Sequence, residues 1–240
     1  MFPVMKLKIV TWNINKAAYT REKLWSYLEK LDFDIGLFQE VYMIPYKIRK
    51  DYYTIHGEMN AILIKKDLTK IRKEDVLFES PEFDVIADFY VSAKIKSDDK
   101  EIVLISVYNY MGPNEEEFSM FLDALFNYIQ NNREREIIVI GGDFNMDENF
   151  KGYLKGWGLL AERMKKKLYQ LNFYEALSHK FGSEAFTFIT PKKKIPYQLD
   201  YLFIPKRIKV QEVEVGNENE IINQKPRLSD HLPIIATIEL

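Results

Sequence analysis

Five short polar clusters follow or end apolar stretches of the chain and carry the residue types that metal-assisted and acid–base chemistry requires. They read Trp12-Asn13-Ile14-Asn15, Gln39-Glu40-Val41, Gly141-Gly142-Asp143-Phe144-Asn145, Gln198-Leu199-Asp200-Tyr201 and Leu228-Ser229-Asp230-His231. Because a sheet presents the side chains at its strand ends rigidly, these clusters could serve one site. Carboxylate oxygens suit Mg²⁺ or Mn²⁺, and Mg²⁺ usually takes one or two protein carboxylates and leaves its other positions to water or a substrate phosphate.

The cluster that contains Asp143 follows the apolar run Ile137–Ile140, which predicts a strand that ends in two glycines. Glycine lets the backbone turn sharply, so the following side chains would project past the sheet edge. Asp143 and Asn145 lie two residues apart and would offer a carboxylate and an amide to one cavity. An Asx turn that only ends the strand explains this motif about equally well.

Glu40 and the segment Ser229–His231 extend this chemistry. A charged residue at the position of Glu40 is more often an exposed strand cap than a cavity carboxylate. Asp230 and His231 could supply a metal ligand and an imidazole, which a further acid must hold, and Asp200 is the candidate. Such an imidazole activates water near neutral pH or stabilises the charge of a phosphorane. An isolated Ser-Asp-His is more often a turn or a helix cap.

The composition narrows the choice of metal and nucleophile. The 240 residues include no cysteine, which excludes disulfides, thiolate zinc sites, iron–sulfur clusters and thiol nucleophiles. The three histidines are His56, His179 and His231, so a three-histidine metal cage would need all of them. His56 and His179 lie outside every cluster, and we expect them at the surface. A metal, if bound, is therefore expected to be a hard cation held by carboxylates.

The charge balance and the apolar runs bear on partners and location. The chain has 34 Lys and Arg against 36 Asp and Glu, a formal net charge of −2. A protein that binds nucleic acid mainly by counterion release usually has an excess of basic residues, so extended non-specific binding of DNA is not expected. A locally basic surface remains an alternative. Met1–Lys8 does not resemble a secretion signal, and no apolar run is long enough to span a bilayer. We therefore expect a cytoplasmic protein with no obligate protein partner.

Apolar runs of strand type outnumber helical patterns in both halves of the chain. The period-3.6 pattern predicts helices at Arg21–Leu31, Glu115–Gln130 and Leu159–Leu171. Strands are predicted at Lys8–Asn13, Ile35–Gln39, Ala61–Lys65, Val85–Ile95, Ile102–Tyr108, Ile137–Ile140, Gln198–Ile204 and Leu232–Ile238. We expect a four-layer α/β/β/α sandwich of two stacked mixed sheets with outer helices, formed by one domain over residues 1–240. A division into two domains near Lys151–Gly158 is the weaker alternative.

The succession of the five clusters resembles the endonuclease/exonuclease/phosphatase family, which shares the fold of pancreatic deoxyribonuclease. The resemblance extends from Ile9 to Ile238, and the motifs come in the order and approximate spacing of that family. The most specific motifs are Gly142–Asn145 and Ser229–His231. The resemblance implies the four-layer fold and hydrolysis of phosphoric esters with Mg²⁺ or Mn²⁺.

The resemblance also assigns roles to individual residues. Glu40 looks like the principal Mg²⁺ ligand of the family. Asp230 looks like a second contributor to the metal site, and Asn13 like a partner of the metal's water and of the substrate phosphate. Phosphodiester cleavage requires charge stabilisation on oxygens that become more negative, and a metal with amide donors supplies it without covalent chemistry by the protein.

The remaining residues of the motifs would carry the proton transfers and the phosphate contacts. Asp143 resembles the acid that orients the attacking water or the leaving group. Asn145 resembles the amide that binds a phosphate oxygen. His231 would contact the scissile phosphate while Asp200 holds its ring.

Three positions distinguish the branches of the family. Tyr108 stands where deoxyribonuclease-like members carry His and abasic-site endonucleases carry Tyr. Tyr110, two residues further on, could take that place instead. Either tyrosine could also be an aromatic residue of the core, without a role in the site. Tyr42 follows Glu40-Val41 where abasic-site enzymes usually carry other residues. Asn15 stands where such enzymes often carry an acid, which suggests one metal carboxylate fewer and a substrate-binding role for Asn15. The substrate therefore cannot be copied from that branch.

A basic loop shortly before Asp200 bears on the substrate. Lys192, Lys193 and Lys194 lie between Pro191 and Pro196, and they could reach a polyanion at the site, although a solvated turn is the commoner reading.

These observations lead to one expected activity. It is a divalent-metal-dependent phosphodiester hydrolase, a nuclease that acts on DNA or RNA by in-line attack of activated water. The alternative is a metal-dependent phosphatase or phosphodiesterase for a small molecule or a lipid headgroup. A binding scaffold without activity is disfavoured because every one of the chemical residues named above is present.

Overall fold

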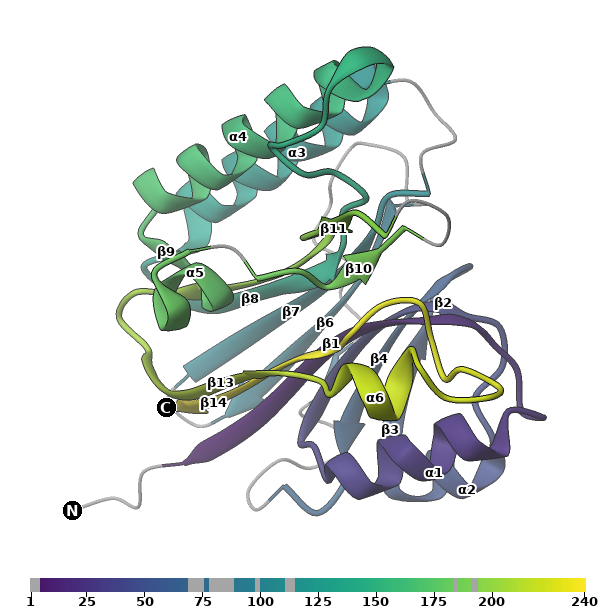
Figure 1. The fold of residues 1–240 in the computed structure, drawn as a ribbon. Coiled ribbons are helices and arrows are strands. Elements are labelled where there is room, and N and C mark those ends of the chain that lie inside the picture. The colour runs from purple at the N-terminus through teal and green to yellow at the C-terminus, as the bar shows by residue number, and fades with distance from the viewer. Residues whose placement is uncertain are drawn as a thin grey trace.

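Two six-stranded sheets form the centre of the computed structural model (Figure 1), which describes residues 5–68, 76–77, 89–97, 100–110, 115–183, 185–190 and 194–240. The first sheet contains, in spatial order, β13 (Lys209–Val215), β14 (Ile234–Glu239), β1 (Lys6–Ala17), β2 (Ile35–Val41), β4 (Asn60–Lys65) and β3 (Tyr52–His56). The second contains β5 (Val76–Leu77), β6 (Tyr90–Ser97), β7 (Lys100–Tyr108), β8 (Glu136–Asp143), β12 (Asp200–Pro205) and β9 (Phe173–Glu175). A separate hairpin pairs β10 (Phe188–Ile189) with β11 (Pro196–Tyr197).

Helices cover the outer face of each sheet (Figure 1). On the first sheet lie α1 (Glu22–Leu31), α2 (Tyr46–Asp51) and α6 (Glu218–Ile221). On the second lie α3 (Glu115–Asn132) and α4 (Lys155–Gln170), with the 3₁₀ turn η3 (Gly152–Leu154) before α4. The short helix α5 (Ala176–Phe181) follows β9. None of the helices in the described part of the chain is long and apolar enough to cross a membrane.

Apolar side chains point alternately to the two faces of each strand, which explains why the sheets stack on one face and are covered by helices on the other. In β1, Leu7 and Ile9 belong to the apolar layer between the two sheets, whereas Val10 and Trp12 face the layer beneath α1. Successive side chains of a strand point to opposite faces, so a strand that is apolar on both faces must be covered on both. The same rule applies to the second sheet, whose outer face packs against α3 and α4. The predicted four-layer sandwich is confirmed.

Both sheets are mixed, and this brings several strand ends to one edge. β1 pairs parallel with β2, and β7 pairs parallel with β8, so the carboxyl ends of each pair meet. Tyr108 lies opposite Asp143 in the register of β7 and β8. Asp143 in turn lies opposite Asp200 in the antiparallel pair β8 and β12. The pairing therefore aligns Tyr108 with two of the polar clusters, those of Asp143 and Asp200, across the second sheet.

The structure shifts several predicted boundaries. The strand predicted to end at Ile140 continues through both glycines to Asp143, so the glycines do not make the sharp turn that we expected. The helix predicted to begin at Leu159 begins at Lys155. It includes Gly156, where an added Cβ would meet only the flexible end of the Glu115 side chain on α3. The first residues of the strand predicted at Val85–Ile95 lie outside the described residues, and β6 extends past its predicted end.

Candidate active site

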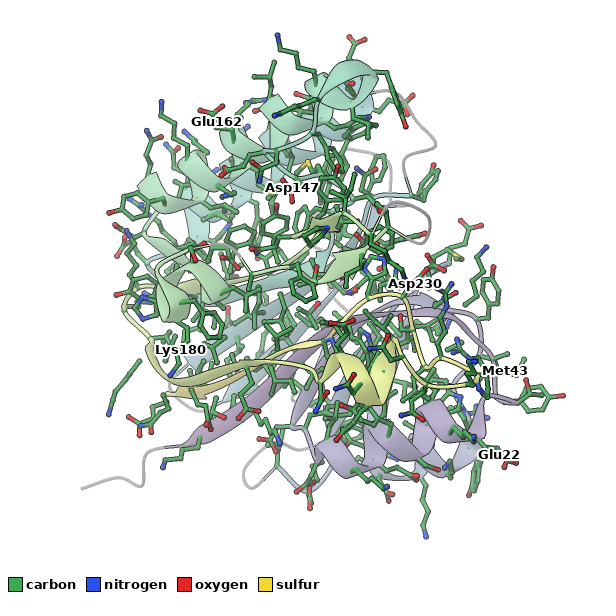
Figure 2. The ribbon with its side chains drawn as sticks, viewed as in Figure 1. Glu22, Met43, Asp147, Glu162, Lys180 and Asp230 are labelled. Carbon is green, nitrogen blue, oxygen red and sulfur yellow. The ribbon has the colours of Figure 1, made fainter. Side chains whose placement is uncertain are left out.

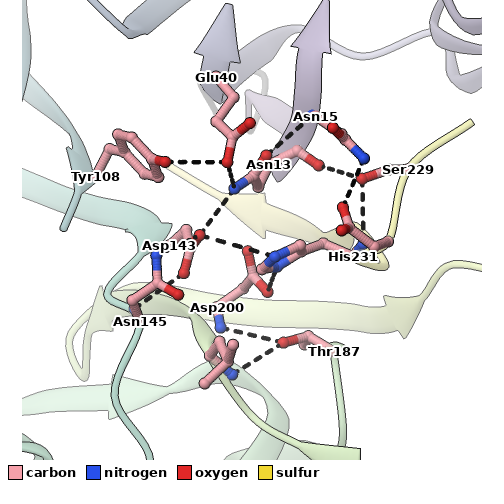
Figure 3. A network of polar contacts seen from close by, with 12 residues as sticks. Asn13, Asn15, Glu40, Tyr108, Asp143, Asn145, Thr187, Asp200, Ser229 and His231 are labelled. Atoms are coloured by element: carbon pink, nitrogen blue, oxygen red, sulfur yellow. Dashed lines mark hydrogen bonds and ion pairs between the residues drawn. The ribbon is translucent and has the colours of Figure 1, made fainter. Parts of the chain in front are cut away.

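Residues from all five polar clusters converge at one edge of the two sheets (Figure 3). The first sheet contributes Asn13 from β1 and Glu40 from the end of β2. The second sheet contributes Tyr108 from β7 and Asp143 from β8, which lies beside Asp200 on β12. His231 enters from the loop before β14, where a bridge to Phe188 ties it to the β10–β11 hairpin. The site is therefore assembled from residues that are far apart in the sequence.

The imidazole of His231 lies between two buried carboxylates. Its Nδ1 is 2.8 Å from Oδ2 of Asp200, a hydrogen bond in which the ring nitrogen donates. Its Nε2 is 3.9 Å from Oδ2 of Asp143, too far for a direct hydrogen bond. Asp143 and Asp200 are fully buried, and the ring of Phe188 covers the imidazole at a centroid distance of 4.9 Å. The Nε2 atom is thus free to contact a group placed between it and Asp143.

The two carboxylates determine the charge of His231. Burial lowers the pKa of the imidazole, but the neighbouring charges of Asp200 and Asp143 and the hydrogen bond to Asp200 outweigh this effect and raise the pKa above its ordinary value. Burial also raises the pKa of Asp143, while the imidazolium and the hydrogen bond from Asn13 oppose that rise. His231 is therefore held as an imidazolium at neutral pH, with a proton available on Nε2.

Hydrogen bonds to the backbone fix the position of this group. Oγ of Ser229 donates to the carbonyl of Asn13 at 2.7 Å and accepts the backbone N–H of His231 at 3.1 Å. Nε1 of Trp12 donates to the carbonyl of His231 at 2.8 Å. Oγ1 of Thr187 accepts the backbone N–H of Asp200 and of its predecessor, each at 3.1 Å. The imidazole and its acid therefore rest on a rigid frame, as a reacting group requires.

Asn13 links the two sides of the site. Its Nδ2 donates to Oδ2 of Asp143 at 2.8 Å and to Oε1 of Glu40 at 3.2 Å. The phenol of Tyr108 donates to the same Glu40 oxygen at 3.0 Å. Burial and the charges of Glu40 and Asp143 raise the pKa of Tyr108, so the phenol keeps its proton and acts as a donor. Tyr108 thus points into the site, whereas Tyr110 is 45% exposed and stacks on Phe89.

Glu40 fits a hard divalent cation. Its Oε1 accepts two hydrogen bonds, whereas its Oε2 accepts none from the residues that the structure describes. Its φ angle of +54° places it in the left-handed region at the end of the strand, a costly conformation that is typical of functional positions. A half-buried carboxylate oriented through one oxygen leaves the other for a metal, consistent with the one or two carboxylates that Mg²⁺ takes.

The other predicted metal residues differ in how they are held. Asp230 accepts Nδ2 of Asn15 at 2.8 Å on one oxygen and pairs with Arg227 at 3.3 Å through the other. Asn15 thus orients Asp230 in this arrangement rather than pointing at an open space. Asp143, Asp200 and His231 form the group of ligand atoms within 4.8 Å of one another in the described part of the chain. The hydrogen bond between Asp200 and His231 occupies two of these atoms, so Glu40 is the better-suited metal ligand.

Asn145 does not project beside Asp143 as an extended strand would place it. Its backbone is left-handed, with φ at +49°. Its N–H donates to Oδ1 of Asp143 at 2.9 Å, and its Nδ2 donates to Oδ2 at 3.1 Å and to the carbonyl of Asn109 at 2.8 Å. The motif is thus an Asx turn and also part of the site. The sequence offered a polar pair at a cavity or an Asx turn as alternatives for this motif, and the structure combines the two.

Gly142 permits the approach of β8 to β7 that places Asp143. A Cβ atom at this position would overlap the carbonyl oxygen of Val107 in the neighbouring strand. We therefore expect Gly142→Ala to lower the free energy of unfolding by about 3 kcal/mol and to displace Asp143. Urea denaturation measures the loss, and Gly57→Ala, where the nearest atom would lie at an ordinary 3.6 Å, is the matched control. Equal midpoints for the two variants would contradict the prediction.

Three contributors to the site were missed by sequence reasoning. Thr187 lies in an ordinary Thr-Phe-Ile-Thr stretch that carries no signal for its role as an acceptor beneath Asp200. Asn109 directly follows Tyr108, and its Nδ2 donates to the carbonyl of Phe144 at 2.9 Å. Its position at the end of the strand could have marked it, as it marked Asn13 and Glu40.

Arg21 is the third missed residue, and it joins the two loops that carry Asn15 and Asp230. Its guanidinium donates to the carbonyls of Ile14 at 3.0 Å and Arg227 at 3.3 Å, and also to those of Asn15 and Leu228. Burial lowers the pKa of Arg21 although Asp230 opposes the shift. Nothing local in the sequence distinguishes this arginine from a surface residue at the start of α1.

Lys194 is the one residue of the predicted basic loop that the structure describes, since Lys192 and Lys193 lie outside the described residues. Lys194 is exposed, and its backbone N–H donates to the carbonyl of Thr190 at 3.1 Å. His56 and His179 are exposed, as expected. Neither takes part in the network of Figure 3.

Comparisons with known proteins agree with this geometry. Residues 10–231 match the model of the Endonuclease/Exonuclease/phosphatase family. No curated protein matches the chain significantly. The 3′ phosphatase NExo from Neisseria, bound to a product DNA hairpin, is similar in structure, with a TM-score of 0.71 and 16% identity over 96% of this chain and 98% of that one.

Two further solved structures share the fold. The AP endonuclease LMAP from Leishmania major has a TM-score of 0.68 and 12% identity over 98% of this chain and 88% of its own. TDP2 from D. rerio, complexed with a single strand DNA product, has a TM-score of 0.63 and 18% identity over 97% of this chain and 98% of its own. At these identities the likeness establishes the architecture, and the activity must be argued from the site.

Proposed function

Because the chain belongs to the endonuclease/exonuclease/phosphatase family, we propose that it is a divalent-metal-dependent phosphodiester hydrolase that cleaves nucleic acid. The resemblance noted in the sequence is confirmed by the family match, and phosphoric ester hydrolysis is the chemistry of that family. The proposal concerns the substrate and the roles of individual residues.

The observation that carries the proposal is the 3.9 Å gap between Nε2 of His231 and Oδ2 of Asp143. A phosphate oxygen or a water molecule placed there contacts a cationic donor on one side and a carboxylate acceptor on the other. Phosphoryl transfer requires a positioned nucleophile in line with the leaving group and stabilisation of negative charge on the phosphoryl oxygens. The gap provides both kinds of contact at adjacent positions.

The roles follow from this arrangement. His231 donates from Nε2 to an oxygen of the scissile phosphate, and Asp200 holds the ring in the protonated state. Asp143 accepts a hydrogen bond from the attacking water, orients it and takes up its proton, which its raised pKa favours. As the bond from this water to phosphorus forms, the bond from phosphorus to the ester oxygen breaks, and the departing oxygen takes up a proton from water. Asn145 orients the carboxylate of Asp143 through two hydrogen bonds. The protein thus binds, orients and moves a proton without forming a covalent bond to the substrate.

Tyr108 and Asn13 orient Glu40 toward a cation. Glu40 would hold the metal, with Asn13 and Asp230 as further contributors, and Mg²⁺ or Mn²⁺ suits these oxygen ligands. When bound, the cation supplies positive charge next to the phosphoryl oxygens.

The choice of nucleic acid rests on two fold neighbours, one bound to a product DNA hairpin and one to a single strand DNA product. The balanced charge of the chain, −2 in total, favours a second candidate, a small phosphorylated molecule that needs no extended basic surface. The apolar layer between the sheets contains residues of both, which supports a single domain over residues 1–240. A cytoplasmic location stays a prediction from the sequence.

Hydrolysis assays separate these candidates. The purified protein is incubated with Mg²⁺, Mn²⁺ or EDTA and with plasmid DNA, RNA, an abasic oligonucleotide or bis-(p-nitrophenyl) phosphate. We expect cleavage of a nucleic acid that requires the metal and stops with EDTA. Cleavage of the small diester with DNA and RNA intact would favour the second candidate, and the absence of metal-dependent hydrolysis of every substrate would contradict the proposed function.

A further inference from the structure

Exposed aromatic side chains lie beside the metal-binding end of the site. Large apolar side chains are normally buried, and an exposed group of them marks a contact surface. Among the described residues, those that follow the ends of the strands carrying Asn13, Glu40 and Tyr108 and remain exposed are Tyr19, Tyr42, Met43, Tyr46 and Tyr110. Figure 2 shows Met43 on the same side of the molecule as Asp230.

Tyr42 and Tyr110 each lie two residues after a residue of the site, Glu40 and Tyr108 respectively. The rings of Tyr108 and Tyr110 are 6.4 Å apart, and Tyr110 also stacks on Phe89 at 5.8 Å. Both tyrosines are about half exposed, at 50% for Tyr42 and 45% for Tyr110. Tyr108 itself donates to Glu40, so the two tyrosines follow the metal ligand and the residue that orients it.

The backbone holds these side chains in place. The N–H groups of Tyr42 and Met43 donate to the carbonyl of Ala17 at 2.9 and 3.1 Å, which ties the chain after Glu40 to the end of β1. Tyr110 follows Asn109, whose N–H donates to the carbonyl of Asp143 at 2.9 Å. An aromatic surface on a fixed backbone loses little conformational entropy when a flat ligand stacks on it.

The charge of the chain indicates what binds there. With 34 basic and 36 acidic residues, the chain has no overall basic excess of the kind that holds a polyanion mainly by counterion release. Lys47, a cation close to Tyr46 in the sequence, pairs with Glu29 at 2.8 Å. Contacts with the bases can therefore supply part of the affinity for nucleic acid, because an aromatic ring stacks on any base whose face is uncovered.

We infer that Tyr42 and Tyr110 bind an unpaired nucleobase next to the scissile phosphate, and that the preferred substrate is therefore single-stranded nucleic acid. This inference rests on the proposed function. In a duplex, neighbouring bases cover both faces of each base, so only an unpaired nucleotide presents the surface that these tyrosines bind. The tyrosines act as specificity residues and leave the proton transfers to His231 and Asp143.

Binding measured without hydrolysis tests the inference. Fluorescence anisotropy in EDTA gives the Kd for a labelled oligothymidylate and for a labelled blunt-ended duplex of the same length. Stacking on a base predicts that Tyr42→Ala and Tyr110→Ala each weaken binding of the single strand by about 5- to 100-fold, that the Phe variants retain it, and that the wild type prefers the single strand by about tenfold or more. The slope of log Kd against log salt should stay below about 2 and unchanged in the variants.

The controls separate the base contact from catalysis and from folding. Tyr169, which is 68% exposed on α4 and lies under the ammonium of Lys206, supplies the matched Tyr→Ala variant that should bind as the wild type does. The turnover number for bis-(p-nitrophenyl) phosphate with Mg²⁺ should be the same in the wild type and in Tyr169→Ala. The inference would be overturned if the double Ala variant of Tyr42 and Tyr110 bound the single strand with the wild-type Kd, or if the wild type bound duplex and single strand equally well. Either result would count against the inference even if metal-dependent hydrolysis supported the proposed function. The binding result stands even if no substrate is hydrolysed.

Discussion

Glu40→Gln is expected to lower the turnover number by about 10³-fold with every substrate that the protein hydrolyses. Glutamine keeps the shape of the side chain and can still accept the hydrogen bonds of Tyr108 and Asn13 on its carbonyl oxygen. It loses the negative charge on the oxygen that those bonds leave free. Removal of the charge stabilisation that a cation supplies costs several kcal/mol in the transition state, and each 1.36 kcal/mol is about tenfold in rate.

Two measurements make this result specific. Calorimetric titration with Mn²⁺ should show binding to the wild type and weak or absent binding to Glu40→Gln, while the midpoint of thermal unfolding in EDTA should be similar for both. Glu29→Gln is the matched control, because Glu29 pairs with Lys47 on the surface of α1 and should affect neither measurement. A Glu40→Gln variant that keeps more than about a tenth of the wild-type rate at saturating metal would exclude Glu40 as the principal ligand.

Asp200→Asn is expected to change both the rate and its dependence on pH. The carboxylate of Asp200 accepts Nδ1 of His231 at 2.8 Å and raises the pKa of the imidazole against the effect of burial. With the charge removed, the pKa of His231 falls, so the imidazolium loses its proton at a lower pH. Because the proposed mechanism requires the protonated ring, the alkaline limb of kcat/KM against pH should move to lower pH by about 1 to 3 units.

The rate should also fall at neutral pH. Carboxylate-to-amide changes behind a catalytic histidine disturb the orientation and protonation of the ring, and we expect kcat/KM to fall by on the order of 10³-fold. The hydrogen bond from the backbone N–H of residue 200 to the hydroxyl of Thr187 is retained, so β12 should keep its position. Asp123→Asn, on the surface of α3, is the matched control. If the alkaline limb stays in place or moves to higher pH, His231 does not act as an acid held by Asp200.

Much of the fold could be read from local patterns. Residues such as Leu7, Ile9, Val10 and Trp12 are apolar on both faces of one strand, and such a strand must be covered on both faces in any fold. The amphipathic pattern after Glu115 likewise predicted α3 to within two residues. Periodicity and burial are properties of a single segment, which explains why they predict elements well and pairings poorly.

The same distinction holds for the candidate site: the sequence identified candidate residues but not their contacts. The absence of cysteine and the order of the motifs determined the chemical class and identified Glu40, Asp143 and His231 as its candidates. The sequence could not choose between Tyr108 and Tyr110, since one ends the strand and the other follows it by two residues. The register of β7 against β8 places Tyr108 opposite Asp143 and within 3.0 Å of Glu40, and that register is a contact between segments that are distant in the chain.

By itself, then, the amino-acid sequence determined the layers, the approximate strands and the family, and it led to the expectation of a hard metal, because each depends on residue type and local spacing. The tertiary structure alone decided how the polar groups bond to one another. Arg21 clamps two loops that lie about two hundred residues apart, and Thr187 supports Asp200 through its hydroxyl. Such bonds depend on the three-dimensional distance between segments, which follows from sheet pairing and packing and leaves no local pattern in the sequence.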